Sequence, residues 1–109
     1  MADLALSPAH VAILERLVAH GFTPVAFPLY ASAIGVRRGS FAALLVPAGE
    51  ASLNVMGEPC YLIGTNLGVR ARRQGRAVFV WKDKAVEATP ELIEEFTRFS
   101  ADLGNLLQT

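Results

Sequence analysis

The sequence predicts an α+β fold with an N-terminal helix, an antiparallel sheet of about five strands, and a C-terminal helix packed on the sheet. Three observations predict it. An amphipathic segment with helix-start residues stands near each end, and the middle consists of short apolar runs separated by Gly and Pro. With 109 residues, 52% of them hydrophobic and 18% charged, the chain has the length and composition of a single folded domain over residues 1–109.

The first helix is expected from Pro8 to about His20. Ser7 can cap the first free amides, Pro8 suits the first helical position, and Gly21 suits the left-handed residue that ends a helix. Apolar residues recur at spacings of three and four, as they do on the buried face of a helix. They are Val11, Leu14, Leu17 and Val18, with Ile13 beside them.

The second helix begins in the same way, with Thr89 as its cap and Pro90 as its first residue. Glu91 then lies near the positive end of the helix dipole. The apolar stripe forms a narrow seam that predicts packing along one line. It consists of Leu92, Phe96, Phe99, Leu103 and Leu106.

Between the helices, runs rich in β-branched and aromatic residues predict the strands. Residues 40–46 are apolar on both faces of the expected strand, which favours a central position covered from both sides. The expected strands are 25–30, 33–37, 40–46 and 59–63, the last with a possible partner at 52–56, followed by a hairpin over 67–82.

The hairpin contains the most informative pattern of the chain. If Gln74 and Gly75 form a two-residue turn, the strand register follows. One side then pairs Arg72 with Ala77, Arg70 with Phe79 and Gly68 with Trp81, and the other pairs Ala71 with Val78, Val69 with Val80 and Leu67 with Lys82. The valine side is expected to face the core, which leaves a surface of arginines and aromatics.

Three hypotheses fit that surface. Phe79 and Trp81 could pack under a helix while the arginines reach outward to Glu91, Glu94 and Glu95. Two copies of the chain could instead bury the aromatics and arginines between them. Alternatively, the bases of a single-stranded nucleic acid could stack on Phe79 and Trp81. Arg70, Arg72, Arg73 and Arg76 would then neutralise its phosphates.

The charge is unevenly spread although it sums to zero. Residues 37–84 carry +5, residues 85–109 carry −4, and the first 36 residues carry −1. Opposed regions of this kind can pair between chains. The zero total argues against the nucleic-acid hypothesis.

Residues that carry catalysis or bind metals are sparse in the sequence. His10 and His20 lie ten apart on one helix, point in different directions, and are expected to be helix-cap or surface residues. Cys60 cannot form an intrachain disulfide and is expected to be a buried or edge thiol. No metal-ligand spacing and no phosphate-binding loop is present. The sequence therefore predicts no enzyme, no cofactor and no metal.

The leading prediction is a small cytoplasmic, non-catalytic interaction module that forms a homodimer or binds another protein. Its single cysteine suits a reducing compartment. The uncharged stretch 17–36 is broken by glycine and prolines, so no membrane span is expected. A weak nucleic-acid-binding domain is the alternative. A third possibility is a small-molecule site in a cleft between sheet and helices, lined by Phe22, Phe27, Tyr30, Phe41 and Tyr61, although these residues are first expected to be core.

Overall fold

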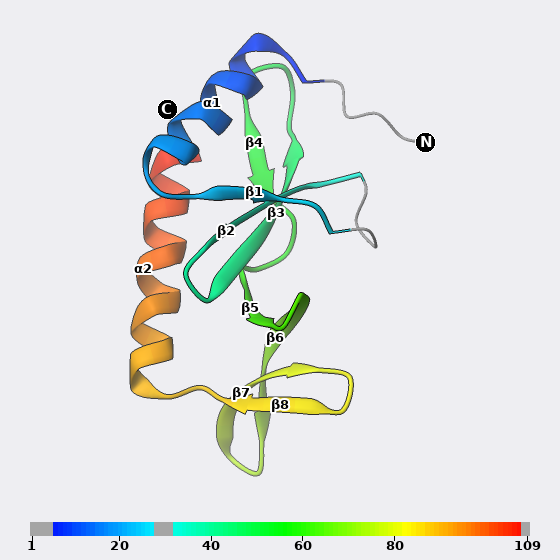
Figure 1. Cartoon of the computed structure of the whole chain (residues 1–109), viewed down its shortest axis with the longest axis vertical. Coiled ribbons are helices and arrows are strands. Elements are labelled where there is room, and N and C mark those ends of the chain that lie inside the picture. The colour runs from blue at the N-terminus through cyan, green and yellow to red at the C-terminus, as the bar shows by residue number, and fades with distance from the viewer. Residues whose placement is uncertain (1–5, 28–31, 108–109) are drawn as a thin grey trace.

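The computed structural model describes residues 6–27 and 32–107, in which two helices cover one face of a curled antiparallel sheet (Figure 1). The α+β prediction is confirmed, and the described residues form eight strands instead of about five. The elements are α1 (Pro8–Ala19), β1 (Thr23–Val25), β2 (Ile34–Arg38), β3 (Phe41–Pro47), β4 (Leu53–Val55), β5 (Cys60–Ile63), β6 (Asn66–Arg73), β7 (Arg76–Trp81), β8 (Lys84–Glu87) and α2 (Pro90–Leu107).

The strands follow the order β1-β2-β3-β5-β6-β7-β8, with β4 attached to β3. β2 pairs with residues 41–45 along one edge of β3, and two short strands share the other edge. Phe41 and Ala42 pair with β5, whereas residues 45–47 pair with β4. The predicted pairing of 52–56 with 59–63 is therefore wrong, because the seven-residue strand β3 has room for both segments.

Two other strand predictions need correction. β1 spans Thr23–Val25 and not 25–30, of which residues 28–30 lie outside the described residues. β8 was not predicted at all. Its four residues begin with a lysine and end with a glutamate, and they pair with β7 across a two-residue turn. Such a short, charged segment has a weak intrinsic preference for β structure, and it forms a strand because it pairs with β7.

α1 begins as predicted with Ser7, whose hydroxyl accepts a hydrogen bond from the His10 amide (3.2 Å) while His10 Nδ1 accepts one from the Ser7 amide (3.1 Å). Its buried residues, however, are His10, Ile13 and Leu17. The predicted stripe is wrong at Val11 and Val18, which are exposed. Apolar residues occupy more than one side of α1, so spacing alone could not choose the side that meets the core.

The α2 prediction is confirmed at both its start and its stripe. Thr89 Oγ1 accepts a hydrogen bond from the Leu92 amide at 3.2 Å. Phe99 and Leu103 are buried, and the remaining stripe residues pack against the core. In Figure 1, α2 runs along one side of the sheet from β8 to α1. At its far end the Arg16 guanidinium donates two hydrogen bonds to the Leu106 carbonyl, which has no partner within the helix.

The sheet carries an apolar cluster on each face. On the helix side, the Phe41 ring lies 5.5 Å, centroid to centroid, from each of Tyr61, Phe79 and Phe96. On the opposite face, Phe27, Ala42 and Leu44 form a smaller cluster. The central, two-sided burial predicted for 40–46 is confirmed. Of the residues suggested for a ligand cleft, Phe22, Phe27 and Phe41 are buried, Tyr61 packs against the core, and Tyr30 lies outside the described residues.

Candidate interaction surfaces

The β6–β7 hairpin has the predicted turn and register. Gln74 and Gly75 both have positive φ, 52° and 78°, as a two-residue turn between antiparallel strands requires. Arg70 pairs with Phe79, and Arg72 with Ala77. The ladder ends at Val69 and Val80, so the two further predicted pairs, Gly68–Trp81 and Leu67–Lys82, are wrong. β6 changes partner there, because Gly68 pairs with Tyr61 of β5.

The burial of the two hairpin faces is the reverse of the prediction. Phe79 is 0% exposed and stacks on Tyr61 with ring centroids 5.1 Å apart. Val69, on the side expected to be core, is 52% exposed. Of the three hypotheses, packing under a helix is thus confirmed for Phe79. The aromatic face of the hairpin is buried because Phe79 packs against Phe41 and Phe96, and clustered aromatic rings bury more apolar area than valines do.

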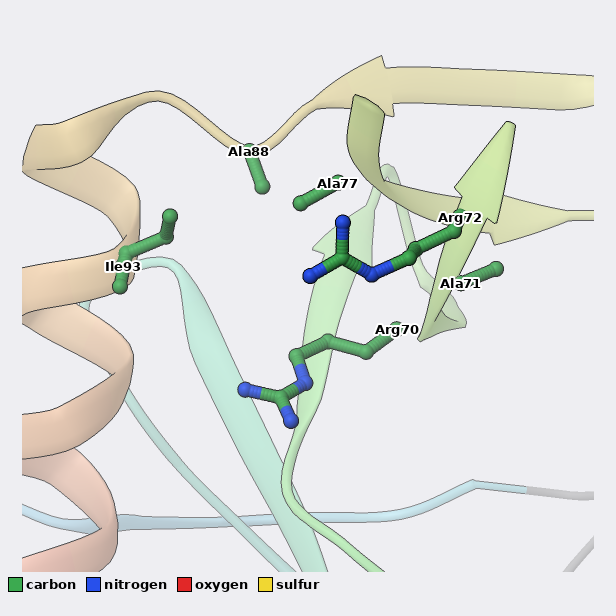
Figure 2. Close-up of a pocket in the computed structure, with 6 residues that line it drawn as sticks. All are labelled: Arg70, Ala71, Arg72, Ala77, Ala88 and Ile93. Atoms are coloured by element: carbon green, nitrogen blue, oxygen red, sulfur yellow. The ribbon is translucent and has the colours of Figure 1, made fainter. Parts of the chain in front are cut away.

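Arg70 and Arg72 extend from β6 toward α2, into a groove between the hairpin and the first turns of that helix (Figure 2). The groove has a volume of about 370 Å³. The rest of its lining is apolar: Ala77, Ala88 and Ile93, together with Ala71, whose side chain points away from the two guanidinium groups (Figure 2). The Arg70 guanidinium carbon lies 5.0 Å from the centre of the Phe96 ring, a cation–π distance. The arginines therefore lie at the margin of the core.

The expected ion pairs between these arginines and α2 are not formed. Among residues 6–27 and 32–107, neither Arg70 nor Arg72 has a carboxylate within ion-pair distance. Glu94 pairs instead with Arg98 at 2.8 Å, and Glu95 accepts a hydrogen bond from the Ser40 amide at 2.8 Å. Among the described residues, two neighbouring guanidinium groups thus share the groove with no ion-pair partner, which favours an anionic group there.

The remaining predicted site residues lie elsewhere. Arg73 and Arg76 face each other at the exposed end of the hairpin, and Arg76 lies 3.7 Å from a carboxylate oxygen of Glu87. Trp81 is half-buried, with the Lys82 ammonium 4.7 Å from the centre of its ring system. The six arginines and aromatics predicted to form an interaction surface thus do not lie on one face. Arg70 and Arg72 share the groove, Phe79 belongs to the core, and Arg73 and Arg76 lie on the opposite side of the hairpin.

The second exposed feature is an apolar patch on the face of the sheet away from the helices. Strand alternation places six side chains there, and this group is termed the outer patch: Leu67, Val69, Ala71, Val78, Val80 and Ala85. Val69 and Ala85 are exposed and the other four are half-buried, Leu67 against the cluster of Phe27, Ala42 and Leu44. A hollow of about 290 Å³ borders it, lined in part by Met56, Leu44 and Cys60. Both described helices lie on the other face (Figure 1). The alternation in β6 and β7 had indicated this patch, but not that it faces outward.

Cys60 borders the same hollow and has the properties of a protonated thiol. Burial raises its pKa above the ordinary value, and the negative charge of Glu58 raises it further. The thiol also donates a hydrogen bond of 3.4 Å to the Glu58 carbonyl. Nucleophilic cysteines need the opposite environment, one that stabilises the thiolate.

The histidines act as helix-cap residues, as predicted, although His10 is buried. His20 ends α1, and its Nδ1 lies 2.9 Å from the Arg16 carbonyl. Within the part of the chain that the structure describes, no three His, Cys, Asp or Glu side chains gather as metal ligands. The helices described there are also too short or too polar to cross a bilayer. Comparison with protein-family models, with curated proteins and with solved structures finds no match for this chain.

Proposed function

We propose that this chain is a small non-catalytic interaction module of the cytoplasm, and that it forms a homodimer through the outer patch. The observation that carries the proposal is the exposure of Val69, 52%, within a group of apolar side chains on neighbouring strands. Contiguous exposed apolar surface commonly marks a contact site. An apolar patch without charges at its centre is complementary to a second copy of itself, as a two-fold interface requires.

The surroundings of the patch support a dimer contact. Arg73, Arg76 and Glu87 lie on the same face at the end of the hairpin, where they would form a polar rim around an apolar centre. A hydrophobic fraction of 52% is high for a chain of 109 residues, which agrees with apolar surface buried between copies. This contact differs from the one expected from the sequence, in which two copies bury the aromatics and arginines of the hairpin between them. Phe79 is fully buried within its own chain and cannot contact a second copy.

Sedimentation velocity of two matched valine variants tests the proposal. Val69→Lys places a charge in the outer patch, whereas Val18→Lys places one on the solvent side of α1, at a residue that is also 52% exposed. The wild type and Val18→Lys are expected to sediment as dimers at micromolar concentration, and Val69→Lys as a monomer. A wild type that stays monomeric at high micromolar concentration, or equal loss of dimer in both variants, would overturn the proposal.

A further inference from the structure

Among the described residues, nothing pairs with one edge of β6 beside Arg70 and Arg72, and this is termed the free edge. The strand pairs with β5 only over residues 66–68, and with β7 over residues 69–73. Along residues 69–73, the side of β6 away from β7 thus has no strand partner among the described residues. Residues 56–59 form no ladder pair with this edge, and a hollow of about 290 Å³ lies between them and Val69 and Arg70.

The backbone groups of Arg70 and Arg72 point toward this free edge. A two-residue turn is flanked by a hydrogen-bonded pair, here Arg73 and Arg76. Along an antiparallel ladder, hydrogen-bonded pairs alternate with pairs that are not hydrogen-bonded to each other. The Arg72–Ala77 pair is therefore not hydrogen-bonded. The Ala77 carbonyl confirms the alternation, since it accepts from the Ala88 amide at 3.0 Å, away from β6. By the same alternation, Arg70 and Arg72 each present an N–H and a C=O to the open side.

The side chains along this edge specify a complementary strand. Arg70 and Arg72 lie on the helix side, in the groove, and have no carboxylate partner there among the described residues. Val69 and Ala71 lie on the other side. Directly opposed side chains on paired strands interact, and opposite charges stabilise the pair. A strand that fits this edge carries acidic residues two apart, opposite the arginines, with apolar residues between them.

A second copy of this chain does not supply such a strand. Antiparallel pairing of β6 with β6 would place arginine against arginine, because the helix-side positions of this segment are Arg70 and Arg72. Nor do any two acidic residues in the 109-residue sequence stand two apart. The charge pattern therefore favours a different protein as the partner.

We propose that the free edge of β6 binds an extended acidic segment of another protein by strand addition. Main-chain hydrogen bonds to Arg70 and Arg72 align the segment, and carboxylates opposite the two guanidinium groups give the specificity. This activity goes beyond the proposed dimer, because it needs the backbone edge of β6 and the arginines of the helix-side groove, whereas the dimer contact needs neither.

The test uses a capped, fluorescein-labelled octapeptide of alternating glutamate and valine, with fluorescence anisotropy and amide exchange as readouts. The peptide is expected to bind and to protect the Arg70 and Arg72 amides from exchange. Arg72→Ala should weaken binding roughly tenfold, equivalent to about 1.4 kcal/mol. Arg73→Ala, which removes the same charge from the opposite face of the hairpin, should change it less than about twofold. Circular dichroism checks that each variant is folded.

Three further comparisons separate strand addition from other modes of binding. A lysine–valine octapeptide should not bind the wild type but should bind Arg72→Glu. Two glutamate peptides carry N-methyl groups on one or the other alternating set of backbone amides, and these are the two methylation frames. The frame that methylates the amides facing β6 should lose affinity, because it cannot extend the sheet. The proposal is overturned if the glutamate peptide does not bind, if Arg73→Ala weakens it as much as Arg72→Ala, or if both methylation frames bind normally. A single-stranded oligonucleotide that binds more tightly through Arg70 and Arg72 would overturn it in favour of nucleic acid.

Discussion

Arg38 of β2 and Asp102 of α2 form an ion pair of 2.8 Å that fixes the helix to the sheet. The same guanidinium lies 4.6 Å from the centre of the Phe22 ring. Phe22 in turn packs edge-on against Phe99 of α2, with ring centroids 5.3 Å apart. One arginine therefore joins two elements and shields the aromatic core beneath it.

Replacing this arginine should destabilise the protein more than replacing an exposed one. Arg38→Ala removes a partly buried ion pair and a cation–π contact and should lower the free energy of unfolding by about 1–2 kcal/mol. Arg98→Ala removes only the exposed pair with Glu94 and should cost about 0.3–0.5 kcal/mol. Urea denaturation measures both. Equal losses in the two variants would show that Arg38 has no special role.

Two glycines should respond oppositely to alanine. A Cβ at Gly35 would lie 2.3 Å from the Val25 carbonyl oxygen and 2.5 Å from ring atoms of Phe27. Gly35→Ala should therefore lower the free energy of unfolding by about 1–3 kcal/mol, as overpacking does. Gly104, within α2, has open space around it, and Gly104→Ala should raise the same free energy by up to about 1 kcal/mol.

Thermal unfolding of the two glycine variants provides the measurement. A higher melting temperature for Gly35→Ala would contradict the prediction, because it would require both the Val25 backbone and the Phe27 ring to move aside without cost. A lower one for Gly104→Ala would mean that α2 needs flexibility at that point.

Cys60 should react slowly with alkylating reagents at pH 7, because its raised pKa keeps the thiol protonated. Its rate with iodoacetamide should lie below that of free cysteine and keep rising as the pH passes about 9, the ordinary value. The folded state holds this proton more tightly than the unfolded state does. The thiol thus stabilises the fold fully below its unfolded pKa, and this contribution is lost as pH rises through the folded pKa.

Cys60→Ser is the control, since it removes the titrating thiol with little change in size. The fall in unfolding free energy between pH 8 and pH 10 should be smaller in this variant than in the wild type. A wild-type thiol that reacts as fast as free cysteine at pH 7 would contradict the prediction.

Trp81 reports on the nucleic-acid hypothesis because it is the single tryptophan. Phe79 is fully buried, so the two-ring stacking platform of that hypothesis does not exist in this fold. Trp81 is itself half-buried beside Lys82. Its emission should therefore stay unchanged when a mixed single-stranded oligonucleotide is added at low salt. Quenching at low salt that disappears at moderate salt would show base stacking together with phosphate contacts.

The sequence by itself determined the features that depend on neighbouring residues. Ser7 and Thr89 begin the helices because their side chains reach amides three residues along the chain. Gln74 and Gly75 set the hairpin register because the turn fixes which residues face each other. Arg70 and Arg72 were thereby placed correctly on one side of one strand.

Only the tertiary structure decided which side of each element is buried. The two faces of the hairpin are both apolar enough to be core, and Phe79 is buried because distant elements bring Phe41 and Phe96 against it. The same holds for the rotation of α1, the attachment of β4 to β3, and the free edge of β6. Burial and strand partnership depend on contacts between residues far apart in sequence, which the local periodicity of a chain does not contain.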